Sequence, residues 1–293
     1  MGRNAEGWGS GLLGVLIFSG SLPATRVAVA GFSPLFLTSA RAVIAALLGA
    51  LLLFLLRQKR TGPADLVSLA IVAVGVVVGF PLLTALALKH ITAAHSTVFI
   101  GLLPLATALF GVIRAGERPQ PAFWVFSVLG ALVVMGFALR GGTGEASLKG
   151  DALMIAAIAL CGLGYAEGAA LSRRLGGWQV ISWALLLALP PMAVLVWLDW
   201  PESFAGITPQ AWTGLGYVSL FSMLIGFVFW YRGLALGGIA GVGQLQLLQP
   251  FFGLLLAGLV LGEPVAPVMV VSALAVVLCV AGARRFSRPA TPR

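Results

Sequence analysis

Ionisable side chains inside long apolar segments are the residues of this chain best suited to chemistry. Arg26, Arg41 and Glu167 each lie within such a segment. A charge in lipid is costly, which makes each a functional-site candidate. An arginine would attract a carboxylate on a small molecule, and Glu167 would bind a proton. The alternatives are snorkelling of Arg26 and Glu167, charge balance of Glu167 by the arginines that follow it, and an interhelical hydrogen-bond anchor for Arg41.

A second group of candidates is polar but uncharged. Gln244, Gln246 and Gln249 place three amides within six residues of one apolar segment. Gln246 and Gln249 share a helix face and are the candidates, whereas Gln244 is offset by two and points elsewhere. Amides donate and accept hydrogen bonds without a permanent charge, which suits zwitterionic solutes. The alternative is hydrogen bonding between helices, at about 0.6 kcal/mol per bond. The other side chains expected to line a cavity are Phe80, Leu83, Thr84, Phe99, Tyr165 and Trp230. For Trp230 and its neighbour Tyr231, a place in an interfacial aromatic belt is the alternative.

Pro81, Pro104 and Pro250 fall inside three of the apolar segments. A proline removes a backbone donor and leaves the carbonyl one turn back without its helical partner. We expect hinges with exposed carbonyls at these positions. A static kink in a packed bundle is the alternative interpretation.

Two acids, Glu117 and Glu263, follow glycine and precede proline-led helices. We expect each carboxylate to meet the free amides at the start of its own following helix, rather than to take part in catalysis. Cys161 and Cys279 lack metal-ligand spacing, and the chain has no GxxxxGK[ST] motif. The sequence therefore predicts no metal site, no cofactor and no ATP-driven pumping.

Composition indicates an integral membrane protein and excludes a water-soluble enzyme. Sixty per cent of the residues are apolar, 9% are charged, and the mean hydropathy is +1.05. A soluble domain carries roughly a quarter charged residues because its surface faces water. Apolar runs of about twenty residues match a hydrocarbon core about 30 Å thick. The sequence predicts an all-α bundle of ten spanning helices: 8–29, 34–56, 66–88, 91–113, 121–139, 150–172, 178–198, 209–233, 238–260 and 264–283.

Basic residues fall mainly on one side of these ten segments. With the N-terminus in the cytoplasm, thirteen lie on the cytoplasmic side and three, Lys89, Arg140 and Lys149, on the outer side. This positive-inside bias predicts that both termini are cytoplasmic. Attraction to anionic lipid headgroups explains the net charge of +9, so no nucleic-acid partner is expected.

An internal repeat divides the chain. The stretch LLPLATALFGVIRAGERPQPAFWVFSVLGALVVMGFALR is echoed by LLQPFFGLLLAGLVLGEPVAPVMVVSALAVVLCVAGARR, which places Glu117 and Glu263 146 residues apart. We expect one transmembrane domain made of repeat one, 1–145, and repeat two, 146–293. Five helices per half is an odd number, so the second half must enter the membrane from the opposite side. Inverted repeats of this kind are a recurrent architecture of secondary transporters.

The doubled Gly-Glu turn, with Pro104 and Pro250 in the helices before it, resembles the drug/metabolite transporter superfamily, specifically its EamA-type ten-helix members. The first two helices add to the likeness with the series Pro23, Arg26, Pro34 and Arg41. Within the superfamily, GFPLLTALAL at 79–88 and FWYRGLALGGIAG at 229–241 are most similar to the YddG-type amino-acid exporters.

The resemblance implies two inverted five-helix halves, a cavity between them, and efflux from the cytoplasm. Aromatic exporters carry several aromatic side chains that face the cavity. The corresponding stretches here hold Phe80, Leu83, Leu103 and Gly162. This departure argues against a substrate range restricted to aromatic compounds.

The leading hypothesis is a secondary transporter that exports amino acids or related metabolites across the bacterial inner membrane by alternating access. A drug, sugar or other metabolite carrier of the same superfamily is the alternative. A channel and a membrane-embedded enzyme rank lower, because an enzyme would need an acid–base or metal cluster at one depth. The expected partners are a small-molecule substrate and the bilayer, with a monomer and a weak homodimer both left open.

Overall fold

Apolar helices make up nearly all of the regular structure. A computed structural model describes residues 2–58, 61–91, 96, 99–139, 147–261 and 267–287, and every regular element within them is helical. The elements before residue 147 are α1 (Arg3–Ser19), α2 (Ser21–Ala28), α3 (Pro34–Leu55), α4 (Pro63–Val72), η1 (Ala73–Gly79), α5 (Phe80–Ala87), α7 (Leu103–Ala115) and α8 (Pro121–Leu139). Those after it are α9 (Leu148–Leu175), α10 (Gly177–Leu198), α11 (Pro209–Tyr217), η2 (Val218–Ile225), α12 (Gly226–Gly237), α13 (Ile239–Gly243), η3 (Gln244–Leu248), α14 (Gln249–Leu261) and α15 (Pro267–Phe286).

Among the described residues, eight helical segments are long and apolar enough to cross a membrane, and α7 and α8 are shorter apolar helices. Each of the ten predicted runs therefore contains helical residues in the described part of the chain. The run expected at 91–113 differs most, because its continuous helix, α7, begins only at Leu103. Within that run, residues 92–95 and 97–98 lie outside the described part of the chain.

Large apolar side chains cover the outside of the bundle. Their exposed fractions are too high for a surface that faces water. Examples are Leu47, Phe54, Leu132, Leu259, Val271 and Leu278. Contiguous apolar surface of this kind is matched by a lipid environment. The chain is thus a multi-pass membrane protein.

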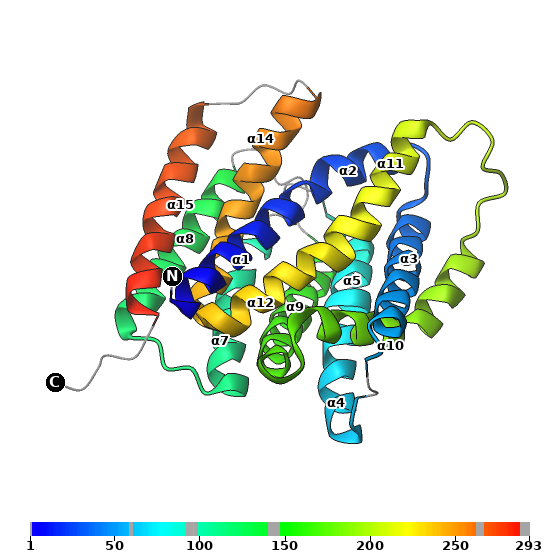
Figure 1. Cartoon of the computed structure of the whole chain (residues 1–293). Helices are drawn as coiled ribbons and strands as arrows, with labels where there is room; N and C mark the ends of the chain where they lie inside the picture. Colours follow the sequence, from blue (N-terminus) through cyan, green and yellow to red (C-terminus); the bar gives the residue numbers. More distant parts are fainter. Residues whose placement is uncertain are drawn as a thin grey trace.

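Helix α9 is the centre of the packing. It contacts α4, η1 and α5 on one side, α7 and α13 on another, and also α10 and α12. The pairs α3 with α10 and α8 with α15 lie on either side of this centre (Figure 1). Helix α9 consequently touches elements drawn from both halves of the sequence.

Glycines allow α1 and α12, which lie side by side in Figure 1, to approach to backbone contact. A Cβ added at Gly233 would lie 2.5 Å from the Gly11 nitrogen, and one added at Gly7 would lie 2.3 Å from the Gly237 nitrogen. Small residues four apart on facing helices bring membrane helices together in this way. The contact between η1 and α9 is built alike, because a Cβ at Gly75 would lie 2.6 Å from the Leu160 carbonyl oxygen.

The three expected hinge prolines stand where an α-helical segment begins. Pro81 follows the π-helical segment η1 at the start of α5, and Pro250 follows the 3₁₀ segment η3 at the start of α14. Pro104 lies in the first turn of α7, not in the middle of a helix as the apolar run suggested. In the first turn of α7 the missing N–H of Pro104 is of no consequence, because no intrahelical carbonyl would accept from it. Pro81 and Pro250 lie within the continuous spans Pro63–Ala87 and Ile239–Leu256, so each removes a backbone donor inside a helix.

A second π-helical segment, η2, interrupts the segment Pro209–Gly237 between α11 and α12. Segment η1 ends in Gly79 and is followed by Phe80. Segment η2 is followed directly by Gly226 and Phe227. Both π-helical segments therefore adjoin a Gly-Phe pair. π turns inside α-helices are uncommon and occur often at functional sites. The two π-helical segments thus lie directly before Phe80 and Phe227 in the chain.

Replacement of Gly233 by valine tests the close α1–α12 contact. The added side chain meets the Gly11 backbone, which cannot move aside, so the two helices must separate. Overpacking costs typically about 1–3 kcal/mol, and we expect the apparent Tm of the detergent-solubilised protein to fall by roughly 5 °C or more. Gly9→Val is the control, because a Cβ at Gly9 meets nothing within 4 Å. Equal melting of the two variants would contradict the contact.

Candidate functional site

Four aromatic rings from three helices meet in the middle of the bundle. Phe18 of α1 lies 5.1 Å from Phe227 and 6.3 Å from Trp230 of α12, measured between ring centroids. Tyr165 of α9 lies 5.6 Å from Trp230 and 6.1 Å from Phe227. These edge and tilted geometries are the ones that aromatic pairs favour. Tyr231 adjoins the group and donates a 3.2 Å hydrogen bond from its hydroxyl to the Gly164 carbonyl.

Two buried amides come from η3, and the second of them reaches this group. Gln244 and Gln246 are buried, and the Gln246 side chain interacts with the Tyr165 hydroxyl. The Gln244 Nε2 donates to the Pro104 carbonyl at 3.4 Å. We call the seven residues the central cluster; they are Phe18, Tyr165, Phe227, Trp230, Tyr231, Gln244 and Gln246.

Several polar atoms of the central cluster are buried without a hydrogen-bond partner. They are the Nε1 donor of Trp230 and the Oε1 acceptors of Gln244 and Gln246. A buried polar atom without a partner costs about 1–3 kcal/mol, so native proteins rarely leave one unless a ligand or water completes it. The cluster thus holds one unpaired donor and two unpaired acceptors beside aromatic rings, which makes it a candidate site for a small molecule with groups of both kinds.

Three of these residues, Tyr165, Trp230 and Gln246, are cavity candidates predicted from the sequence, and the structure brings them together. The alternative that Trp230 and Tyr231 lie in an interfacial belt is wrong, because both side chains are fully buried. Phe18, Phe227 and the site role of Gln244 were missed. Phe227 could have been found, since Gly226-Phe227 copies Gly79-Phe80 one half-chain earlier.

The remaining cavity candidates lie around the cluster rather than within it. Phe80 and Phe99 are partly buried and pack against the main core, and Leu83 is also partly buried. Thr84 has a buried hydroxyl without a partner. Gln249 begins α14, and its backbone carbonyl accepts a 3.2 Å hydrogen bond from the Ser19 hydroxyl.

Glu167 is held by two other helices. Its carboxylate accepts hydrogen bonds from the Ser68 hydroxyl of α4 at 2.5 Å and from Arg114 Nε of α7 at 2.7 Å. Its side chain is 7% exposed, whereas that of Arg114 is 45% exposed. Charge balance by Arg173 and Arg174 is therefore the wrong interpretation for Glu167. Those two arginines pair with other acids.

The two intramembrane arginines differ in their surroundings. Arg41 is partly buried in α3, and its Nε atom is buried without a hydrogen-bond partner. Arg26 is exposed in the last turn of α2. Snorkelling suits an exposed side chain at a helix end, so the geometry of Arg26 favours that interpretation over a buried site.

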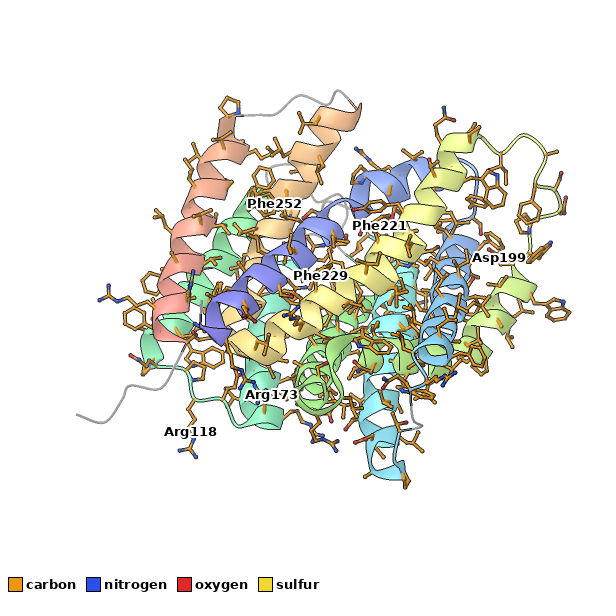
Figure 2. The ribbon with its side chains drawn as sticks, in the orientation of Figure 1. Arg118, Arg173, Asp199, Phe221, Phe229 and Phe252 are labelled. Carbon is orange, nitrogen blue, oxygen red and sulfur yellow. The ribbon has the colours of Figure 1, made fainter. Side chains whose placement is uncertain are left out.

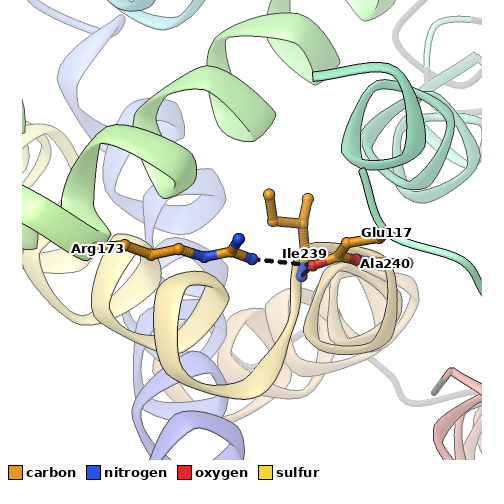
Figure 3. Close-up of polar contacts among 4 residues, drawn as sticks. All are labelled: Glu117, Arg173, Ile239 and Ala240. Carbon is orange, nitrogen blue, oxygen red and sulfur yellow. Dashed lines mark hydrogen bonds and ion pairs between the residues drawn. The ribbon is translucent and has the colours of Figure 1, made fainter. Parts of the chain in front are cut away.

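Glu117 joins three separate elements (Figure 3). Its two carboxylate oxygens accept hydrogen bonds from the backbone nitrogens of Ile239 and Ala240, each at 2.7 Å, and Arg173 of α9 lies 3.2 Å away. Gly238, at φ +95°, turns the chain so that these nitrogens face the carboxylate. We call this arrangement the Glu117 latch.

The latch corrects the expected role of Glu117. A carboxylate does cap free amides at a helix start, but the helix is α13, in the other half of the chain, and not the following helix α8. Sequence separation hid this partner, since Ile239 lies 122 positions after Glu117. Glu263, the repeat-related acid, lies outside the described residues.

More ion pairs gather at the same end of the bundle, which we call the Glu117 end. Asp65 of α4 pairs with Arg174 of α9, and Glu6 of α1 lies 3.7 Å from Arg232 of α12. The ends of α7, α9 and α12 thus meet the starts of α1, α4 and α13. The arginines of these pairs, which the positive-inside pattern predicts to lie on one side of the membrane, lie together at the Glu117 end.

The profile of the EamA-like transporter family matches residues 7–139 and 148–284, which is most of the chain. The chain belongs to this transporter family. A protein of Bacillus subtilis named "Uncharacterized transporter YdeK" is 63% identical over 98% of this chain and 100% of its own length. The EamA-type resemblance seen in the sequence is therefore confirmed at the level of the family.

Two more distant relatives extend the comparison. A "Probable terminal-alkyne amino-acid exporter" of Streptantibioticus cattleyicolor is 24% identical over 89% of this chain and 87% of its own length. A solved crystal structure that is 20% identical covers 94% of this chain and 97% of that one, with a TM-score of 0.78. At that identity, the structural likeness shows a shared fold alone.

Removal of the Gln246 amide tests the central cluster as a ligand site. Gln246→Leu roughly keeps the volume but deletes an unpaired acceptor, and we expect the KM for the transported substrate to rise about tenfold, the effect of one lost hydrogen bond to a charged group. Gln210→Leu, on exposed α11, is the matched control. An unchanged KM in the Gln246 variant, measured by flux into proteoliposomes, would remove this residue from the site.

Proposed function

We propose that this transporter exports small zwitterionic metabolites, most of all amino acids, across the bacterial inner membrane. The observation that carries the proposal is the unpaired donor and acceptors of the central cluster. An ammonium group donates to the Gln244 and Gln246 oxygens, while the Trp230 N–H donates to a carboxylate. The rings of Phe18, Tyr165 and Phe227 then accommodate an apolar side chain.

The relative named as an amino-acid exporter supports the same substrate class, since its likeness extends over 89% of this chain. The cluster is also mixed rather than wholly aromatic. Neutral amides make up its polar part, so a substrate with both charges can bind without leaving a buried protein charge unpaired. This favours a zwitterion over a cationic drug.

The mechanism we propose is alternating access between two inverted five-helix halves of a ten-helix bundle, divided near residue 145. Packing between the halves supports it. The first segment of repeat one, 3–28, packs on the third segment of repeat two, 209–237. Likewise the first segment of repeat two, 148–175, packs on the third segment of repeat one, 63–87. Helix α3 packs on its repeat-related counterpart α10, and α8 packs on its counterpart α15.

Two further observations support a duplicated chain. The family profile matches it twice, in consecutive stretches of similar length. The π-helical segments η1 and η2 begin at Ala73 and Val218, 145 residues apart, close to the 146 that separate the two Gly-Glu turns. A shared irregularity at equivalent positions is hard to explain by packing alone. In this scheme Pro81, Pro104 and Pro250 serve as hinge positions.

We further propose that the Glu117 end faces the cytoplasm, with both chain termini on that side. The basic residues support this orientation through the positive-inside bias. Tryptophans at the opposite end fit an outer interfacial belt, since Trp197, Trp200 and Trp212 are exposed near the α10–α11 connection.

Flux measurements test the proposed function. The purified chain in proteoliposomes of phosphatidylethanolamine and phosphatidylglycerol should give saturable uptake and counterflow of labelled L-leucine, L-phenylalanine or L-threonine. Protein-free vesicles are the control for leak. Movement of glucose or ethidium without any amino-acid flux would contradict the proposal, and conductance without saturation would indicate a channel.

Cysteine accessibility tests the inverted topology. In a Cys161→Ala, Cys279→Ala background, Arg118→Cys and Pro264→Cys place one thiol after each Gly-Glu turn. We expect a membrane-impermeant maleimide added to intact cells to label position 264 but not position 118, and to label both after lysis. Labelling of both positions from the same side would rule out the inverted arrangement.

A further inference from the structure

A cavity of about 370 Å³ opens beside the Glu117 latch. Its polar lining consists of Asn4, Glu117, Arg118, Arg173 and Ser287, together with backbone from the α12–α13 junction. Figure 2 shows Arg118 and Arg173 at this end of the molecule, well away from Asp199 at the opposite end. Small-molecule pockets span roughly 300–1,000 Å³, so this one has room for a single small metabolite.

The cavity is separate from the central cluster. None of its lining residues belongs to the cluster, and the cluster residues are buried whereas Arg118 and Arg173 are exposed. The latch lies at its wall, because Glu117 and Arg173 line the cavity and also bind one another at 3.2 Å. A molecule in the cavity therefore meets both partners of that ion pair.

The charges of the lining match those of a zwitterion. Two guanidinium groups, of Arg118 and Arg173, suit a carboxylate, which they bind through paired N–H donors. The single carboxylate, Glu117, suits an ammonium group. A ligand with one charge only would either leave Glu117 without a cation or compete with it for the same arginine.

We propose that this cavity is an entry site for zwitterionic substrates, and that a substrate bound there takes Arg173 from Glu117. The carboxylate of the substrate pairs with Arg173 and Arg118, and its ammonium replaces Arg173 at Glu117. No ion is left unpaired by this exchange. Glu117 keeps its hydrogen bonds to Ile239 and Ala240, but its tie to α9 is released.

The proposal rests on the proposed function for its substrate class and for the side of the membrane. It adds a second site, and it assigns Arg118 and Arg173 to substrate recognition. Both arginines are exposed and thus screened by salt, so the expected affinity is low and falls as ionic strength rises.

Alkylation of a cysteine in the cavity tests the proposal. Ser287→Cys, in the Cys161→Ala, Cys279→Ala background, provides a reporter in the lining, and the rate of reaction with a charged maleimide is measured in detergent. We expect saturating L-leucine to slow the reaction at least about threefold, as occupancy of a low-affinity site predicts. Isoamylamine and 4-methylpentanoic acid, which each carry one of the two charges, should not slow it. Gln58→Cys, exposed at the same end outside the cavity, is the control reporter.

Three substitutions separate the entry site from the central cluster. Arg173→Gln should abolish the protection by L-leucine, whereas Arg232→Gln, at the same end but outside the lining, should keep it. Protection should persist in Gln246→Leu. Loss of protection in that variant, equal protection by the single-charge analogues, or no protection at all would overturn the entry site. Flux by the unmodified chain remains an independent measure of the proposed function.

Discussion

A bilayer supplies no hydrogen-bond partners, and this constraint explains most of the polar structure of the chain. Glu167 lies in the membrane-spanning α9 and is satisfied by Ser68 and Arg114. Pro104 lies in the first turn of α7, where a missing N–H is of no consequence. Against this background the central cluster stands out because three of its members, Trp230, Gln244 and Gln246, keep buried polar atoms without a partner, as Arg41 and Thr84 do elsewhere.

Helix α9 connects the central cluster to the ion pairs at the Glu117 end. Its middle contributes Tyr165 to the central cluster, and its last turns carry Glu167, Arg173 and Arg174, which pair with three other segments of the chain. Any movement that opens the Glu117 end must change these pairs. The aromatic group and the ion pairs are thus mechanically linked through one continuous helix.

Helix positions could be predicted well from sequence, because lipid requires about twenty apolar residues per span whatever the neighbours are. The end of α8 at Leu139 and the start of α11 at Pro209 illustrate this. Local irregularities could not be predicted. Nothing in the run AVGVVVG predicts the π-helical segment η1, in which Gly75 lies in close contact with α9.

The sequence indicated which kinds of residue form the candidate site, but not which residues contact one another. Tyr165, Trp230 and Gln246 stand out as polar or amphipathic residues in apolar runs. Their assembly depends on the backbone contact between α1 and α12, which brings Phe18 against Phe227. Glu117 shows the same limit, since its role as a helix cap could be inferred while the helix it caps lies far away in the sequence.

The π-helical segment η2 has a geometric consequence for Trp230. A π turn holds one residue more than the α-helical hydrogen-bond register would. Moving that extra residue along the helix shifts the residues between its old and new positions by one place, a rotation of about 100° with an advance of about 1.5 Å. Trp230 lies five residues beyond the end of η2. If the extra residue moved past Trp230, the indole would turn by about 100° about the helix axis, with no broken chain and no unfolded turn.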